Sequence, residues 1–237
     1  PMATLDIDAI VLAGGLGTRL LSVALGRQKT VAPIGKTAVL GYVLDLVEAA
    51  GISRVILAVG HRADDVVSFV GARRGGTVEY LFSTEDVPLG TGGAIRHALP
   101  LVRSSDVLVL NGDSFVKSDP ARLVAFHRHK SAKIAMLAVE VTDTSRYGRV
   151  DVGPDDSVRA FREKGEGTGG GWINAGVYVI GRAEIEAIPP GASSVERDIL
   201  PGYCGKGLYA LRTQAPFIDI GTPESFRAAE GFFKTHG

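Results

Sequence analysis

A glycine-rich stretch, Ala13–Arg19, follows the first apolar run of the chain and has the composition of a phosphate-binding loop. Its glycines, Gly14, Gly15 and Gly17, allow a tight bend and let backbone N–H groups approach a ligand closely. Arg19 adds a forked guanidinium that matches two phosphate oxygens. Ligands of α/β proteins lie at the carboxyl ends of such strands. The stretch indicates an anion site, and a plain structural turn is the alternative.

Asp113 closes another apolar run, in Leu110-Asn111-Gly112-Asp113. A carboxylate at the carboxyl end of a strand is well placed for a magnesium ion that bridges phosphate oxygens. An isolated Asn-Gly-Asp also forms ordinary turns. Both motifs therefore depend on the elements that position them.

Apolar runs of strand length alternate with helical patterns over the first 130 residues. This alternation implies an α/β fold with a Rossmann-like, mostly parallel sheet that helices cover on both faces. We expect strands at Ile7–Leu12, Val55–Val59, Val78–Phe82 and Val107–Leu110, and helices at Thr37–Ala50, Asp64–Val70, Gly92–Leu99 and Pro120–His129.

The pattern changes after about residue 131, where strand candidates follow one another with turns between them. We expect strands at Ile134–Val141, Gly148–Val152, Val158–Arg162 and Trp172–Ile180, and helices at Arg182–Ile188 and Pro223–Phe233. The sequence thus predicts a single domain over residues 2–235. Residues 2–130 form a ligand-binding half, and residues 131–235 add a smaller antiparallel substrate lobe.

Composition excludes several classes of protein. Lys plus Arg and Asp plus Glu balance at 26 each, so no global field indicates nucleic acid or an anionic membrane as a partner. The single cysteine, Cys204, excludes an internal disulfide framework, and the histidines lack metal-ligand spacing. No apolar run reaches the roughly 18 residues that span a bilayer. We expect a cytoplasmic protein without a signal peptide.

Two rival phosphate-binding motifs do not fit. In a dinucleotide-binding Gly-x-Gly-x-x-Gly, the third glycine would stand where the chain has Leu20. Such a fold also needs an acidic residue about 20 positions later, and none occurs between Asp8 and Asp45. Gly35-Lys36-Thr37 imitates the end of a Walker A loop, but the earlier glycine is replaced by Thr30.

Leu12–Leu20 reads Leu-Ala-Gly-Gly-Leu-Gly-Thr-Arg-Leu and resembles the opening of the sugar-1-phosphate nucleotidyltransferase family. A Pro-Lys follows in that family; here Lys29 takes the place of the lysine, and Gln28 replaces the proline. The resemblance implies a GT-A-like nucleotidyltransferase fold. It also implies nucleotide contacts from Leu12, Gly14, Gly15, Arg19 and Lys29, of which the two cations hold the triphosphate.

Matches to the same family continue along the chain. Pro88–Ala94 looks like its base-binding loop, which assigns Gly90 and Thr91 to the nucleotide. Asp219 resembles the family's second metal aspartate, beside Asp113. On its own, Asp219 could equally be the N-cap of the last helix.

The sugar side of the family site is matched by three short segments and one longer one. The segments are Tyr147–Val150, Glu163-Lys164, Asn174–Gly176 and Ser194–Pro201. The resemblance assigns the sugar 1-phosphate to Gly148, Glu163, Lys164 and Asn174. An Asn side chain donates and accepts at once, which suits a polyol.

The reaction that the resemblance implies needs no protein nucleophile. An oxygen of the sugar 1-phosphate attacks the α-phosphorus of a nucleoside triphosphate, and pyrophosphate leaves. Catalysis then consists of holding two anions together and neutralising the developing charge. We expect Arg19, Lys29 and Asp113 to be catalytic, and Mg²⁺ to bind Asp113 and Asp219. A homo-oligomer is a further possibility that the sequence leaves open.

Glu85 lies five residues before Gly90 and is the candidate for reading the base. Guanine presents two adjacent donors, N1–H and N2–H₂, and a carboxylate accepts both. Uracil and thymine present one donor between two acceptors, and a carboxylate would repel one of these acceptors. Glu85 therefore favours GTP. A uridylyl- or thymidylyltransferase is the alternative, because some small uridylyl relatives also carry an acid nearby.

The stretches Leu21–Val23 and Asn111–Phe115 are most similar to bacterial D-glycero-D-manno-heptose 1-phosphate guanylyltransferases, which serve capsule or other surface-polysaccharide synthesis. We therefore expect this heptose phosphate as the acceptor. Mannose 1-phosphate is the closest alternative, followed by N-acetylmuramate or glucose 1-phosphate. An inactive nucleotide-sugar-binding regulatory subunit also stays open, since a fold does not ensure activity. The retention of both cations and both metal aspartates argues against it.

Overall fold

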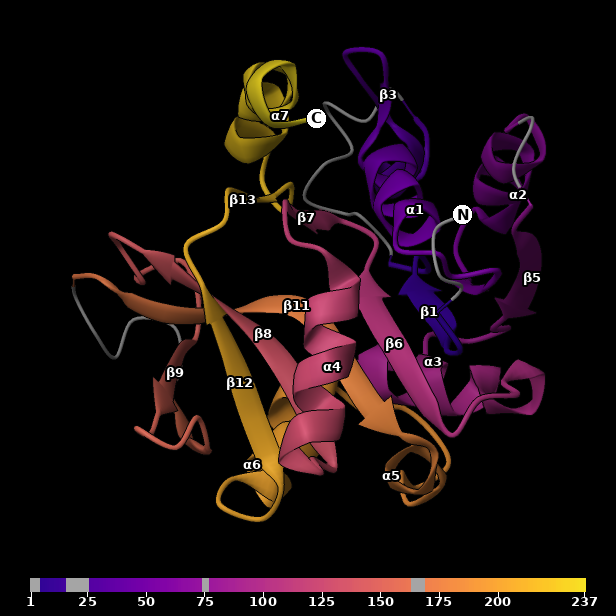
Figure 1. The fold of residues 1–237 in the computed structure, drawn as a ribbon. Helices are drawn as coiled ribbons and strands as arrows, with labels where there is room; N and C mark the ends of the chain where they lie inside the picture. Colours follow the sequence, from indigo (N-terminus) through magenta and orange to yellow (C-terminus); the bar gives the residue numbers. More distant parts are fainter. Residues whose placement is uncertain (1–4, 16–25, 74–76, 163–168) are drawn as a thin grey trace.

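The computed structural model describes residues 5–15, 26–73, 77–162 and 169–237, and has a main β-sheet with helices packed on both faces (Figure 1). Its first half is a run of parallel strands in the order β6-β1-β4-β5. These strands are β1 (Asp8–Leu12), β4 (Arg54–Val59), β5 (Glu79–Thr84) and β6 (Asp106–Asn111). The predicted parallel α/β sheet is confirmed, and each strand ends within two residues of its expected bounds.

The second half of the chain extends the same sheet. The long strand β11 (Gly171–Gly181) pairs antiparallel with β6 and with β8 (Ile134–Val141). β12 (Leu208–Thr213) then pairs parallel with β8. β8 and β12 run in the same direction as β6, but among the described strand pairings beyond residue 131 only the pairing of β8 with β12 is parallel. The sequence did not predict β12.

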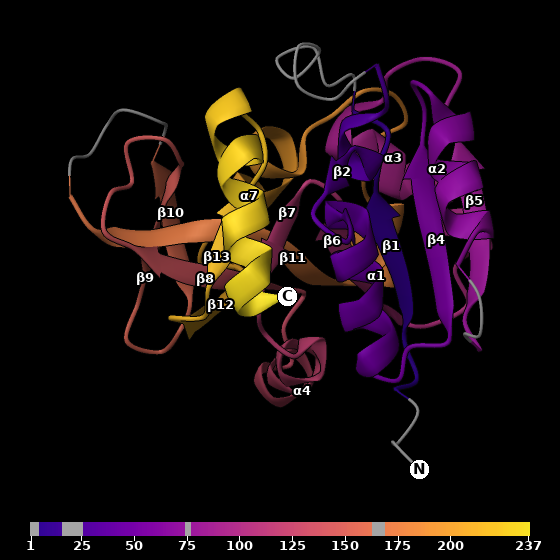
Figure 2. The same cartoon turned by 90° about the horizontal axis from the view of Figure 1, so that it is seen from above.

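The expected antiparallel lobe consists of β9 (Arg149–Val152) and β10 (Val158–Arg162), which lie beside the first half of β11. Figure 2 shows this pair at the opposite end of the molecule from β5. The pairing of β11 with β8 shifts register between Asn174 and Tyr178, where Gly176 has a φ of +72°. The shift separates the part of β11 that pairs with β6 from the part beside β9.

Alternate side chains of β1 enter two different cores. Ala9 and Val11 belong to a core that includes residues of α1 (Val39–Ala49), α2 (Ala63–Gly71), α4 (Pro120–Lys130) and α7 (Pro223–His236). Ile10 belongs to the core on the other face, with residues of α3 (Gly90–Ala98) and α5 (Arg182–Glu186). Period-two alternation of a strand between helical layers is the arrangement expected for a sheet covered on both faces.

Several short elements join these layers. They are the 3₁₀ helices Lys29–Val31 and Leu99–Leu101, β2 (Pro33–Ile34), β3 (Thr37–Ala38), β7 (Ser114–Val116), the π-helix Val195–Ile199, α6 (Leu200–Tyr203) and β13 (Phe217–Asp219). Within the described residues, no helix has the length and apolar character needed to cross a bilayer.

Candidate functional site

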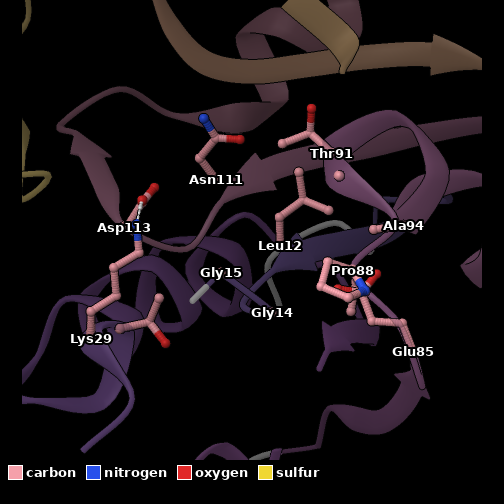
Figure 3. A pocket seen from close by; sticks show the side chains of 13 residues that line it. Leu12, Gly14, Gly15, Lys29, Glu85, Pro88, Thr91, Ala94, Asn111 and Asp113 are labelled. Carbon is pink, nitrogen blue, oxygen red and sulfur yellow. Dashed lines mark hydrogen bonds and ion pairs between the residues drawn. The ribbon is translucent and has the colours of Figure 1, made fainter. Parts of the chain in front are cut away.

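A cavity of about 260 Å³ opens at the carboxyl ends of three parallel strands (Figure 3). Leu12 of β1 pairs with Asn111 of β6 and Ala58 of β4, so these three lining residues stand level in the sheet. The structure brings to this cavity every described residue that was predicted to bind nucleotide, together with the two described catalytic candidates: Leu12, Gly14, Gly15, Glu85, Gly90, Thr91, Lys29 and Asp113. We call it the nucleotide cavity below, after that prediction.

Lys29 and Asp113 form an ion pair between Nζ and Oδ2 at one side of the nucleotide cavity, as Figure 3 shows. Lys29 begins the 3₁₀ helix Lys29–Val31, and Asp113 follows the end of β6. Their side chains are 15% and 24% exposed, so both reach the cavity while largely shielded from solvent. A cation and a carboxylate at this place can hold phosphate oxygens and a metal ion respectively.

Gln28, which stands where the family has a proline, fixes this segment by side-chain hydrogen bonds. Its side chain is buried, and its Nε2 donates to the carbonyl oxygens of Ala13 at 2.7 Å and Gly15 at 3.3 Å. Its Oε1 accepts from the backbone N–H of Thr30 at 2.6 Å and so caps the 3₁₀ helix. One side chain therefore ties the glycine-rich stretch to the segment that carries Lys29.

Glu85 packs against the glycine-rich stretch at the other side of the cavity. A β-carbon on Gly14 would lie 3.1 Å from Oε1 of Glu85, and one on Gly60 would lie 2.8 Å from the same atom. The Oε2 atom accepts from the backbone N–H of Leu89 at 3.2 Å. Burial raises the pKa of Glu85, and the bond from Leu89 and the nearby His97 offset this only in part. The pocket therefore holds a half-buried carboxylate that has oxygen lone pairs for a donor-rich base edge.

The loop that precedes α3 is fixed by the segment around Ser193. The backbone N–H of Gly92 donates to the carbonyl oxygen of Ser193 at 2.9 Å, and the N–H of Ser193 donates to Leu89 at 2.9 Å. Gly90 has a φ of +67°, and a β-carbon there would lie 2.5 Å from the Ser193 oxygen. Position 90 therefore requires glycine, because the backbone angle is positive and a β-carbon would clash with Ser193. Gly90 begins α3, two residues before the predicted start.

The second predicted metal ligand lies on the strand next to Asp113. β7 and β13 pair antiparallel, with Asp219 opposite Ser114, and the N–H of Ile220 donates to the carbonyl oxygen of Asp113 at 3.0 Å. The N-cap of α7 is Thr222, so the alternative that Asp219 caps this helix is wrong. Oδ1 of Asp219 instead accepts from the N–H of Gly221 at 2.8 Å.

These two carboxylates fit the chemistry of magnesium, which takes oxygen ligands and commonly uses one or two carboxylates together with substrate phosphates and water. Within the described ranges, no cluster of three or more His, Cys, Asp and Glu side chains is arranged to hold a metal ion. A site built from Asp113 and Asp219 would therefore need oxygens from the substrate to complete it.

A second cavity of about 680 Å³ adjoins the first and includes Gly148 and Asn174, which were predicted to bind the sugar 1-phosphate. We call it the sugar cavity. Asn111 lines both cavities. Its Oδ1 is buried and accepts no hydrogen bond from the part of the chain that the structure describes. A β-carbon on Gly176 would lie 2.5 Å from Nδ2 of Asn111, so glycine is needed for this side chain to reach the junction.

Some predicted residues lie outside the described part of the chain: Arg19, Glu163 and Lys164, with the rest of 16–25 and 163–168. The sequence prediction also missed lining residues. It assigned no role to Asn111 beyond its place in the Asn-Gly-Asp motif, and it left the role of Glu196 in the sugar cavity open. The glycine of Asn174–Gly176, which makes room for Asn111, was a signal that could have been followed.

The family described as nucleotidyl transferase matches residues 8–235. A mannose-1-phosphate guanylyltransferase of Mycobacterium tuberculosis is 37% identical over 231 residues, which cover 95% of this chain and 64% of that protein. A D-glycero-alpha-D-manno-heptose 1-phosphate guanylyltransferase of Aneurinibacillus thermoaerophilus is 35% identical over 227 residues, covering 94% of this chain and 97% of that protein. The chain thus spans less than two thirds of the first relative and nearly all of the second.

Solved structures give the same picture. The crystal structure of HddC from Yersinia pseudotuberculosis complexed with GMP-PN has a TM-score of 0.84 at 35% identity, and the match covers 96% of this chain and 99% of that one. A putative glucose-1-phosphate thymidylyltransferase from Bacillus anthracis also has a TM-score of 0.84, but at 21% identity. The second likeness shows the fold alone.

Proposed function

The chain belongs to the nucleotidyl transferase family, and from that premise we propose that it transfers GMP from GTP to a sugar 1-phosphate and releases pyrophosphate. The observation that carries the proposal is the pair of adjoining cavities that meet at Asn111. One contains the Lys29–Asp113 pair and the half-buried Glu85, and the other is lined by Asn174, whose amide can both donate and accept hydrogen bonds. Two substrates seated in them would meet end to end.

The transfer needs one P–O bond to form and one to break. An oxygen of the sugar 1-phosphate, already anionic at neutral pH, attacks the α-phosphorus of GTP, and the bond to the β-phosphate oxygen breaks so that pyrophosphate leaves with the electron pair. The cavities supply position and charge for this step. Lys29 neutralises phosphate charge, and Oδ1 of Asn111, which accepts no hydrogen bond from the described residues, can accept one from a hydroxyl or N–H of a substrate at the junction. Arg19 and Lys164 complete the cationic set by resemblance.

Magnesium belongs to the proposal as the group that Asp113 and Asp219 would hold. When bound it neutralises phosphate charge in the transition state. The adjacent strands β7 and β13 and the all-oxygen donor set support this assignment. Lys29 already compensates the charge of Asp113, which reduces its repulsion with Asp219 before any metal binds.

Glu85 supports guanine as the base. Its carboxylate lies beside Gly14 at the wall of the nucleotide cavity, and guanine offers N1–H and N2–H₂ side by side. The relatives at 37% and 35% identity are also named as guanylyltransferases. An inactive sensor would have little reason to keep an ion pair of a catalytic lysine and a metal aspartate.

We propose D-glycero-D-manno-heptose 1-phosphate as the acceptor and a role in surface-polysaccharide synthesis, on the strength of the resemblance of Asn111–Phe115 to that branch. The heptose relatives at 35% and 33% identity support it. Mannose 1-phosphate is the second candidate, because the relative from Mycobacterium tuberculosis is equally similar.

Pyrophosphate release, measured with GTP, ATP, UTP and dTTP against a panel of sugar 1-phosphates, tests these proposals. We expect magnesium-dependent release that is fastest with GTP and the heptose phosphate. Faster turnover of mannose 1-phosphate would make it the assigned acceptor in place of the heptose phosphate, and the proposed reaction would stand. Faster turnover of UTP or dTTP would remove the role of Glu85, and no release with any pair would contradict the transferase itself.

A further inference from the structure

A chain of side-chain hydrogen bonds links the sugar cavity to the nucleotide cavity. Nδ2 of Asn174 donates to the hydroxyl of Tyr178 at 2.6 Å, and that hydroxyl donates to Oε1 of Glu196 at 3.2 Å. The other carboxylate oxygen of Glu196 accepts from the hydroxyls of Thr91 at 3.1 Å and Ser194 at 3.0 Å. Asn174 and Glu196 line the sugar cavity, and Thr91 lines the nucleotide cavity.

The carboxylate of Glu196 imposes a direction on this chain because it can only accept hydrogen bonds. The hydroxyl of Tyr178 must donate its one proton to Glu196, so its oxygen has to accept the hydrogen bond from Asn174. Tyr178 is fully buried, and burial together with the nearby Glu196 raises the pKa of its phenol, which keeps the proton in place.

The amide of Asn174 is therefore turned in one way only. Its NH₂ group faces Tyr178, and its Oδ1 accepts from the backbone N–H of Gly176 at 2.9 Å. These two bonds agree with each other, because a reversed amide would set NH₂ against the N–H of Gly176. One N–H and one oxygen lone pair of Asn174 remain for a ligand in the sugar cavity.

The hydroxyl of Thr91 is directed in the same manner at the other end. It donates to Glu196 and accepts from the backbone N–H of Val195 at 2.8 Å. A hydroxyl has one proton and two lone pairs, so a single lone pair remains. Thr91 can thus present only an acceptor to the nucleotide cavity.

We propose that Glu196 is a positioning residue which sets the hydrogen-bond polarity of both cavities: it restricts Thr91 to accepting from the nucleotide and fixes Asn174 as a paired donor and acceptor for the sugar phosphate. The proposal rests on the proposed function and deepens it. It selects substrates by the direction of their hydrogen bonds, namely a nucleotide that donates to Thr91 and a sugar whose hydroxyls both donate and accept at Asn174.

Two variants act on different sides of the hydrogen-bond network around Glu196. Tyr178→Phe keeps the buried ring and removes the link to Asn174. Glu196→Gln keeps the shape but adds an NH₂ group. Because the Tyr178 hydroxyl accepts from Asn174 and needs an acceptor for its own proton, the Gln oxygen stays towards Tyr178. The new NH₂ therefore lies on the Thr91 side, where it forces the Thr91 proton towards the nucleotide. The affected substrate should therefore differ between the two variants.

Steady-state kinetics with GTP and with mannose 1-phosphate or the heptose phosphate varied in turn measure this difference. We expect Tyr178→Phe to raise KM for the sugar phosphate about tenfold and to leave KM for GTP within about twofold, the scale of one mispaired buried group. Glu196→Gln should show the reverse split, about tenfold on GTP and about twofold on the sugar phosphate.

Tyr80→Phe and Glu48→Gln are matched controls. Tyr80 also donates to a glutamate, Glu48, but neither residue lines either cavity. Both controls should leave each KM unchanged even if the melting temperature falls. Tyr178→Phe and Glu196→Gln could instead affect the two KM values equally, or affect neither. Either result would show that these hydrogen bonds have only a structural role and would overturn the proposal.

A failure of the proposed function gives a different result. If the native protein turns over no pair of substrates, calorimetric binding of GTP and of mannose 1-phosphate replaces KM, and the same split between the variants is expected in Kd. Native protein that binds neither compound would contradict both the function and the inference.

Discussion

At the scale of single residues, Asp113 has two partners to satisfy, Lys29 now and a magnesium ion in the proposed reaction. Asp113→Ala would leave Lys29 without its counter-charge and remove a metal ligand. We expect the rate to fall by roughly 10²-fold or more, the scale for losing one preorganised charge stabiliser. Pyrophosphate release as a function of magnesium concentration measures it. Near-normal turnover by a folded variant would end the metal assignment.

Lys29 should act on the nucleotide rather than on the sugar. It lines only the nucleotide cavity among the two cavities described, opposite Glu85. Lys29→Ala should raise KM for GTP and lower kcat while changing KM for the sugar phosphate little. Lys164→Ala, in the segment matched to the sugar side, should do the opposite. Varying each substrate in turn decides this, and identical kinetic profiles for the two variants would refute the division of labour.

Glu85 should choose the base by charge-assisted hydrogen bonds to N1–H and N2–H₂. Glu85→Gln keeps the shape but sets a donor against a donor, which costs about 1–3 kcal/mol, or about fivefold to more than a hundredfold in affinity. Inosine triphosphate lacks the N2 amine, so it should be a poorer substrate of the native protein and lose less in the variant.

Comparing kcat/KM for GTP and inosine triphosphate with both proteins forms a double-mutant cycle between the side chain and the amine. A coupling energy near zero would show that the backbone near Gly90 reads the base. The closeness of Glu85 to Gly14 and Gly60 argues for substantial coupling, because a solvated carboxylate would affect both triphosphates weakly and equally.

At the scale of elements, the 3₁₀ helix Lys29–Val31 is held to the glycine-rich stretch by Gln28. The backbone of Gln28 has φ of −61° and ψ of 133°, which are angles that proline adopts. The family's proline would therefore fit here without backbone strain. It could not replace the bond from the N–H of Gln28 to Oδ2 of Asp65 at 2.8 Å, or those of the side chain.

Gln28→Pro and Gln28→Ala separate these contributions. Both remove the buried amide, and proline also removes the N–H that reaches Asp65. Because unsatisfied buried groups cost about 1–3 kcal/mol each, we expect both variants to unfold more easily and to raise KM for GTP. Proline should be the more destabilising, as measured by urea unfolding. A Gln28→Pro variant that is as stable as the native protein would show that the family residue is freely interchangeable here.

The regular elements could be predicted from the sequence wherever a periodic apolar pattern set them, as in β1, β4 and α1. The short strand β12 and the pair β7–β13 could not, because their pairing depends on partners far along the chain rather than on local pattern. The same holds within the site. The order of the motifs was enough to identify Lys29 and Asp113 as candidate site residues. It could not predict the hydrogen bond between Thr91 and Glu196, because these residues are 105 positions apart in the sequence.

At the scale of the whole molecule, one sheet carries both cavities. β6 contributes Asn111 to their junction and pairs with β1 on one side and β11 on the other. Gly14 and Gly15 follow β1, Asp113 follows β6 and Glu85 follows β5, whereas Asn174 lies on β11, on the other side of the shift in its pairing with β8. A continuous hydrogen-bonded sheet is stiff across its strands, so the relative placement of the two substrates is set by folding rather than by docking of separate lobes.

This rigid placement holds Glu85 in a half-buried position that costs the fold stability, because burial raises its pKa. With a folded pKa above the unfolded one, the native state binds the proton more tightly, so stability falls as pH rises from the unfolded pKa through the raised one. Glu85→Gln removes the charge, so the variant should melt at a higher temperature than the native protein at pH 7.

The advantage should shrink as pH falls and vanish below about pH 4, near the ordinary pKa of Glu, where Glu85 is protonated in both states. Thermal unfolding of both proteins from about pH 3 to about pH 8, on either side of the ordinary pKa of Glu, measures it, with Glu79→Gln as an exposed control that loses an ion pair with Arg54. Native protein that melts as high as the Gln variant at pH 7 would show that the Glu85 carboxylate carries no folding cost. The combination of a stability gain with a loss of GTP use would identify Glu85 as a residue retained for its substrate.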